Sequence, residues 1–101
     1  MTQVQERDRH AEEIARVREV VARHPFPAFV TGFDVRLGEF DGDRALWITF
    51  WLDHDIAEPG RELSALSDLR RVVLRDILDT LDDRFPYFRF HRDRSRAVAA
   101  G

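Results

Sequence analysis

The side chains with the best-placed chemistry in this sequence are histidines and carboxylates, and that chemistry would be the binding of a divalent cation. Asp53, His54 and Asp55 follow one another directly, and His91 and Asp93 stand two residues apart. Imidazole nitrogens and carboxylate oxygens are ligands for zinc and manganese. Successive residues of an extended chain point to opposite sides, however, so three adjacent side chains converge only where the chain turns sharply. We therefore expect an acidic loop after residue 52 rather than a metal centre, and no cofactor.

The residues needed for nucleophilic catalysis or nucleotide binding are missing. The sequence has no cysteine, and neither Ser64 nor Ser67 stands in a Gly-x-Ser-x-Gly motif. There is no glycine-rich phosphate loop and no dinucleotide-binding fingerprint. We therefore expect a protein that is not an enzyme.

Composition places the chain in a broad class. Its 101 residues are 44% hydrophobic, 35% charged and 11% aromatic, which is typical of one folded domain rather than of a disordered chain. No apolar run approaches the ~20 residues that span a bilayer, and the beginning of the sequence is charged, so we expect no membrane segment and no secretory signal. The absence of cysteine fits a cytoplasmic protein. The net charge of −3 makes the chain a poor binder of polyanions.

The first periodic segment is amphipathic. Pro25 disfavours helical geometry in the residue before it, so the helix should end there. Residues 1–9 are polar and lack periodicity, and we expect them to form a flexible N-terminus. Apolar residues recur at steps of three and four, which predicts a helix over about residues 10–24: Ala11, Ile14, Val17 and Val21.

Asp41-Gly42 is a two-residue turn signal between two alternating segments, because glycine accepts the positive φ that a type I′ turn requires. Folding about this turn brings three apolar pairs to one face. Turn chemistry and side-chain pattern thus indicate the same hairpin register. The pairs are Leu37 with Leu46, Val35 with Ile48, and Phe33 with Phe50.

A loop and a second amphipathic helix should follow the hairpin. The loop over residues 53–62 contains Pro59-Gly60. Ser64 or Ser67 can cap the helix, which should run to about Asp83. Its inner stripe is expected to comprise Leu66, Leu69, Val73 and Ile77, widened by Leu74, Leu78 and Leu81.

The C-terminal part of the chain alternates again. Phe85-Pro86 should end the second helix, and residues 87–91 should form a strand with two phenylalanines on one side. We expect residues 95–101 to be a flexible tail. One α+β domain then spans residues 10–94.

The order helix, strand, strand, helix, strand predicts a two-layer αββαβ sandwich of the ferredoxin-like or metallochaperone-like kind. The second and third strands are joined by a helix, so they should be parallel and adjacent, with the second strand in the centre of a three-stranded mixed sheet. Both helices should cover the face that carries the apolar strand residues.

The opposite face of this sheet carries the candidate functional residues. Aromatic side chains bury ~150–250 Å² each when covered, so the aromatic residues of this face would form a larger apolar patch than a monomer ordinarily exposes. We therefore expect a partner to cover it. The proposed interaction surface comprises Arg36, Trp47, Trp51, Tyr87, Arg89 and His91.

Three kinds of occupant fit this surface. We favour a second copy of the chain, because Trp, Tyr and Arg are enriched at the centres of protein interfaces. A different protein, or the tail of the chain itself, comes next. Single-stranded nucleic acid would stack on the rings beside Arg36 and Arg89, but the negative net charge disfavours it.

These inferences predict a small, cytoplasmic, non-catalytic interaction or regulatory module that forms a homodimer. The alternative is a domain that responds to a divalent metal. Its candidate ligands are Asp53, His54, Asp55, His91 and Asp93.

From His24 onward the chain resembles the cytoplasmic dimerisation domain of cation-efflux transporters, without the membrane helices that precede the domain in that family. The resemblance implies a metallochaperone-like fold and dimerisation, with Asp53, His54, His91 and Asp93 as the only stand-ins for metal ligands. The order of elements is also similar to that of KH-type folds, but the GxxG clamp of those folds is absent. The resemblance is carried by His24-Pro25, Phe33-Asp34-Val35-Arg36, the strand running into Asp53, Arg84-Phe85-Pro86 and His91-Arg92-Asp93.

Overall fold

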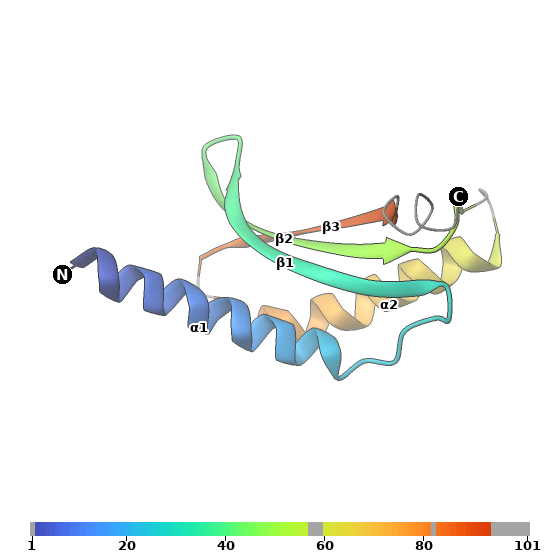
Figure 1. Ribbon diagram of the computed structural model, residues 1–101, viewed down its shortest axis with the longest axis horizontal. Helices are drawn as coiled ribbons and strands as arrows, with labels where there is room; N and C mark the ends of the chain where they lie inside the picture. Colours follow the sequence, from blue (N-terminus) through green and yellow to red (C-terminus); the bar gives the residue numbers. More distant parts are fainter. Residues whose placement is uncertain (1, 57–59, 82, 94–101) are drawn as a thin grey trace.

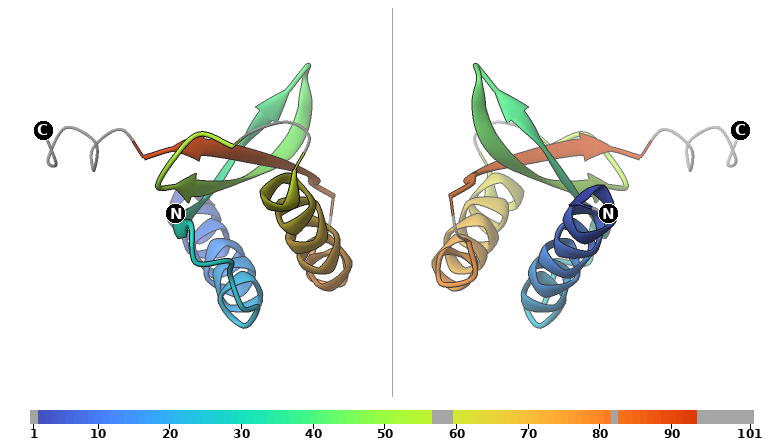
Figure 2. Two further views of the ribbon diagram at one scale, coloured as in Figure 1. Left: turned by 90° about the vertical axis from the view of Figure 1, so that its right-hand side faces the viewer. Right: turned by 90° about the vertical axis from the view of Figure 1, so that its left-hand side faces the viewer.

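A computed structural model describes residues 2–56, 60–81 and 83–93, and it confirms the αββαβ sandwich (Figure 1). The sheet has the order β1-β2-β3, with β1 antiparallel and β3 parallel to the central β2. Both helices lie on the same side of the sheet (Figure 2). Within the described residues, the other side, which we call the open face, has no helix against it. The elements are α1 (Thr2–Ala22), β1 (Val30–Phe40), β2 (Asp43–Leu52), α2 (Arg61–Leu78) and β3 (Phe85–Arg92).

The hairpin has the register that its turn predicts. Asp41 and Gly42 both have positive φ, 54° and 86°, as a type I′ turn requires. Leu37 lies opposite Leu46, and the two other predicted apolar pairs are also in register. The turn end of the hairpin bends away from the helices in Figure 1, so the open face is curved rather than flat.

The core lies between the helices and the apolar side of the sheet. Phe50 is fully buried at its centre, and its ring packs against Phe26, Phe88 and Phe90 with centroid separations of 5.6, 6.4 and 5.6 Å. The four residues of the predicted inner stripe of α2 are all buried. Leu78, which was expected to widen this stripe, is instead exposed at the last residue of the helix.

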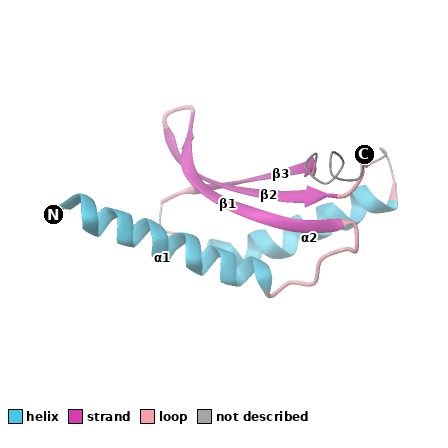
Figure 3. Ribbon diagram, in the orientation of Figure 1, coloured by secondary structure: helices cyan, strands magenta, loops and turns pink. Residues whose placement is uncertain are grey.

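The predicted beginnings of both helices are wrong (Figure 3). α1 is helical from Thr2, whereas the apolar period begins at Ala11. The added turns contain neither glycine nor proline, and their Gln, Glu and Arg residues are good helix formers without any apolar pattern. α2 begins at Arg61, so Ser64 and Ser67 lie inside the helix and neither caps it.

The end of α2 also differs from the prediction. The helix ends at Leu78 rather than near Asp83. The Thr80 backbone N–H and hydroxyl both donate to the Ile77 carbonyl, at 2.9 and 2.8 Å. These bonds satisfy a terminal carbonyl and close the helix before Phe85-Pro86 is reached.

The largely buried side chain of Arg84 links α1 to the sheet. The Arg84 guanidinium lies 3.2–3.3 Å from the Glu13 carboxylate, and it also donates to the carbonyls of Gly38 and Ala45 at 3.4 and 3.2 Å. The two charged side chains are only 7% and 13% exposed. One side chain, from the residue just before β3, thus contacts α1 and both strands of the hairpin.

Some predictions lie outside the described residues, namely the tail at 95–101 and residues 57–59 of the loop. In the part of the chain that the structure does describe, no helix has the length and apolar character needed to cross a membrane.

Candidate interaction surface on the open face

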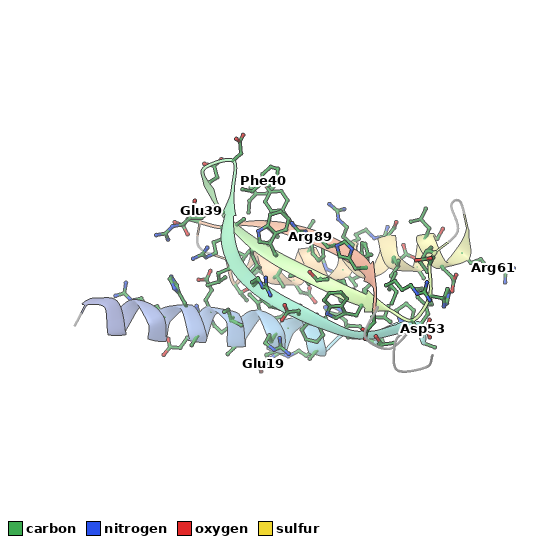
Figure 4. All side chains as sticks on the ribbon, turned by 45° about the horizontal axis from the view of Figure 1, so that its top comes forward. Glu19, Glu39, Phe40, Asp53, Arg61 and Arg89 are labelled. Atoms are coloured by element: carbon green, nitrogen blue, oxygen red, sulfur yellow. The ribbon has the colours of Figure 1, made fainter. Side chains whose placement is uncertain are left out.

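Strand alternation and register bring the six predicted surface residues to the open face in adjacent rows. Arg36 lies opposite Trp47, which in turn lies opposite Tyr87. Trp51 is paired with His91, and Arg89 lies opposite Thr49 in the row between. In Figure 4 Arg89 stands on this side of the sheet, whereas Glu19 lies on α1.

The aromatic residues of the open face are in mutual contact. Trp47 and Tyr87 stack with ring centroids 4.7 Å apart and an interplanar angle of 26°. Phe40 lies 4.9 Å from Tyr87 and 5.8 Å from Trp47, and Phe85 lies 5.8 Å from Tyr87. We call these four residues the aromatic cluster. It connects all three strands at the turn end of the sheet.

Phe40 and Phe85 are members of this cluster that the sequence analysis missed. Their exposed fractions are 50% and 67%, the largest among the described Phe, Tyr and Trp residues. Each stands at an even spacing from a residue already assigned to the open face, Phe40 from Arg36 and Phe85 from Tyr87. Extending the alternation to the ends of the strands would have identified both.

The indole of Trp47 lies against Gly38 of β1. A Cβ atom on Gly38 would lie 3.4 Å from both Cδ1 and Nε1 of that ring, an ordinary van der Waals distance. The indole therefore lies beside bare backbone of β1.

Arg89 covers the Trp47 ring. Its guanidinium carbon lies 4.1 Å from the ring centroid, a cation–π contact. Within the described part of the chain, no carboxylate pairs with Arg89. A guanidinium stacked in this way keeps N–H donors at its edge for a further acceptor.

A shallow groove of about 460 Å³ continues from Trp47 along the open face. Trp51 and His91 line it, with ring centroids 6.2 Å apart. Asp34 lines it from β1, and its carboxylate lies 3.8 Å from Arg18 and 3.9 Å from Arg36. Both distances exceed those of a hydrogen bond, so the Asp34 carboxylate is only loosely held.

The structure does not bring the first group of candidate metal ligands to one point. His54 lies between two carboxylates, with Nδ1 2.5 Å from Asp53 and Nε2 2.6 Å from Glu62. Asp55 instead lies 3.6 Å from Arg92. Glu62, eight residues beyond His54 and in the first turn of α2, is a partner that the sequence analysis missed, because sequence spacing alone does not show that the two side chains meet.

The hydrogen bond with Glu62, and then that with Asp53, raises the pKa of His54 above its ordinary value. Both ring nitrogens are therefore engaged as donors in the protonated form. A metal ion would have to displace a proton and a carboxylate from the ring.

The second group, His91 and Asp93, lies at the end of β3. His91 packs beside Trp51, and the Asp93 backbone N–H donates to the Leu52 carbonyl at 2.7 Å. Over residues 2–56, 60–81 and 83–93, no three His, Asp or Glu side chains are arranged as a metal site.

Comparisons of the chain with protein-family models, with curated proteins and with solved structures find no match. The open face and the chemistry of its side chains are therefore the features of the molecule that bear on its function.

Proposed function

We propose that this protein is a non-catalytic interaction module that forms a homodimer by packing its open face on that of a second copy. The observation that carries the proposal is the aromatic cluster, which lies on the side of the sheet opposite both helices. Trp, Tyr and Arg at the centre of one surface are the residue types that dominate interface energetics.

The size of the face suits a weak dimer. Three strands about 4.8 Å apart and eight residues long, at about 3.3 Å per residue, have a footprint of roughly 400 Å² before side chains widen it. Two such footprints bury about 800 Å² in total, and more once the side chains widen them, which is near the ~1,000 Å² lower limit for a specific interface. We therefore expect dissociation at micromolar concentrations.

Other occupants have less support. Nucleic acid would need more cations than this face offers, since Asp34 lies in the same groove as Arg36 and Arg89. Metal-responsive regulation is not favoured, because the carboxylates of Asp53 and Glu62 already engage both nitrogens of His54.

Sedimentation equilibrium of the full chain from about 1 to about 200 µM tests the proposal, because micromolar association falls in this range. We expect a monomer–dimer equilibrium for the wild type, and monomer alone for the double variant Trp47→Ser, Trp51→Ser. Leu78→Ser removes an exposed apolar residue from α2 and should leave the equilibrium unchanged. Far-UV circular dichroism confirms that each variant is folded.

Two results would overturn the proposal. One is a wild type that stays monomeric at the highest concentration, and the other is a folded Trp47, Trp51 double variant that dimerises like the wild type. Titration with single-stranded oligonucleotides at low salt, followed by Trp fluorescence, tests whether nucleic acid occupies the open face instead, because stacked bases would quench both indoles.

A further inference from the structure

Opposite charges stand at the two edges of the open face in one row. Thr49 of β2 is paired with Asp34 of β1 on one side and with Arg89 of β3 on the other. Two strand spacings, about 10 Å, separate the backbones of Asp34 and Arg89, and the Arg89 guanidinium lies over the Trp47 ring rather than against the Asp34 carboxylate. The Asp34 side chain is 45% exposed, and within the described residues Arg89 has no carboxylate partner.

The symmetry of a dimer limits how this row can meet its copy. Packing two identical faces requires a two-fold axis that lies in the plane of the interface. If the axis runs along β2, the edges are exchanged, so β1 covers β3 of the second copy. If the axis crosses the strands at Thr49, each edge covers its own copy, and Asp34 meets Asp34 while Arg89 meets Arg89.

The first arrangement pairs every charge in the row, and the second opposes like charges. A crossing axis shifted by one residue would pair Asp34 with Arg36, but it would leave Arg89 without a carboxylate. We infer that the two protomers meet with the axis along β2, so that Asp34 of each protomer pairs with Arg89 of the other. This inference rests on the proposed homodimer and specifies its register.

The contact is chemically suitable on both sides. Arg89 keeps its stacking on Trp47 while its guanidinium edge donates to the carboxylate. Packed sheets cross at about 30°, which displaces residues one strand away from the axis by only about 2–3 Å, within the reach of an arginine side chain. The same axis places Trp47 against its own copy and Arg36 against Tyr87.

Charge reversal tests this register by sedimentation equilibrium at the concentrations given above. Asp34→Arg and Arg89→Asp alone each oppose like charges twice, so each should raise the dissociation constant at least about tenfold. In an equal mixture of the two variants, both contacts become opposite in charge, and a heterodimer should form with near wild-type affinity. The control is a mixture of Arg36→Asp with Asp34→Arg. Arg36→Asp keeps both Asp34–Arg89 contacts and should dimerise with itself, whereas its heterodimer with Asp34→Arg still opposes two cations at one contact and should not reach wild-type affinity.

The outcomes separate the register from the dimer itself. The register would be overturned if the first mixture failed to associate, or if Arg36→Asp formed a heterodimer of wild-type affinity with Asp34→Arg. The proposed homodimer would still stand in either case if the Trp variant is monomeric. A monomeric wild type would refute both. Should a reversal fail to fold, the wild-type dissociation constant is measured from about 50 to about 500 mM NaCl, where it should rise if the ion pairs exist and stay constant if they do not.

Discussion

Replacing Arg84 with methionine should destabilise the fold strongly. The change keeps much of the side-chain volume but removes the guanidinium that joins Glu13 to the carbonyls of Gly38 and Ala45. It leaves the Glu13 carboxylate, only 13% exposed, without its cation.

The size of the effect follows from this burial. Removing one partner of a buried ion pair costs about 3–5 kcal/mol, because the remaining charge stays poorly solvated. The distances from Arg84 to Glu13, 3.2 and 3.3 Å, are long for a charged hydrogen bond, so we expect the lower end, about 3 kcal/mol. For a chain of this length, such a loss lowers the melting temperature by more than about 10 °C.

Urea unfolding followed by far-UV circular dichroism measures the free energy of unfolding. All variants are compared at one protein concentration, because dimerisation would add to the apparent stability. Arg44→Met is the matched control: Arg44 and Asp83 also pair at 3.2 Å, but their side chains are 63% and 61% exposed. This variant should lose no more than about 1 kcal/mol.

The double variant Arg84→Met, Glu13→Met provides the second test. It should be more stable than Arg84→Met alone, because no unpaired charge is left inside. If Arg84→Met is as stable as Arg44→Met, the ion pair does not hold α1 to the sheet, and the reasoning fails.

Three further predictions concern the core, the turn and His54. Phe50→Ala should lower the free energy of unfolding by about 3–5 kcal/mol in the same urea assay, since the ring is fully buried among other rings; a loss below about 1 kcal/mol would contradict that packing. Gly42→Ala should cost about 1 kcal/mol because of its positive φ, whereas Gly32→Ala, where a Cβ meets nothing within 4 Å, serves as the comparison. The pKa of His54 is raised in the folded state, so its stabilising contribution is complete below the unfolded value and is lost as pH rises through the folded one. His54→Gln should therefore destabilise the protein more at about pH 5.5 than at about pH 8.5, and an NMR titration of the imidazole that gives a pKa at or below 6.5 would refute this.

Local patterns predicted the parts of the fold that short-range chemistry determines. The Asp41-Gly42 turn and the alternation on either side of it determined the hairpin register, because a slip of one residue would turn every apolar side chain outward. The stripe from Leu66 to Ile77 likewise determined which side of α2 is buried. The helix ends were predicted less well, since α1 begins at Thr2 whereas the recurring apolar residues begin only at Ala11.

Such local patterns could not predict side-chain interactions between segments that are distant in the sequence. Glu13 and Arg84 are 71 residues apart and meet because α1 passes close to the residue that precedes β3. His54 follows β2 and Glu62 lies in the first turn of α2, and the two side chains meet although they are eight residues apart. In the sequence, nothing distinguishes these four residues from ordinary surface charges, and only the three-dimensional structure identifies them as partners.

The parallel pairing of β3 with β2 has a consequence for the order in which the chain folds. The hairpin can form from neighbouring residues, but Tyr87 and Arg89 reach Trp47 only after a loop about 40 residues long has closed. Trp47 is therefore exposed on the early hairpin and becomes covered last. Its fluorescence should consequently change in the final kinetic phase of refolding, when the docking of β3 completes the three-stranded open face.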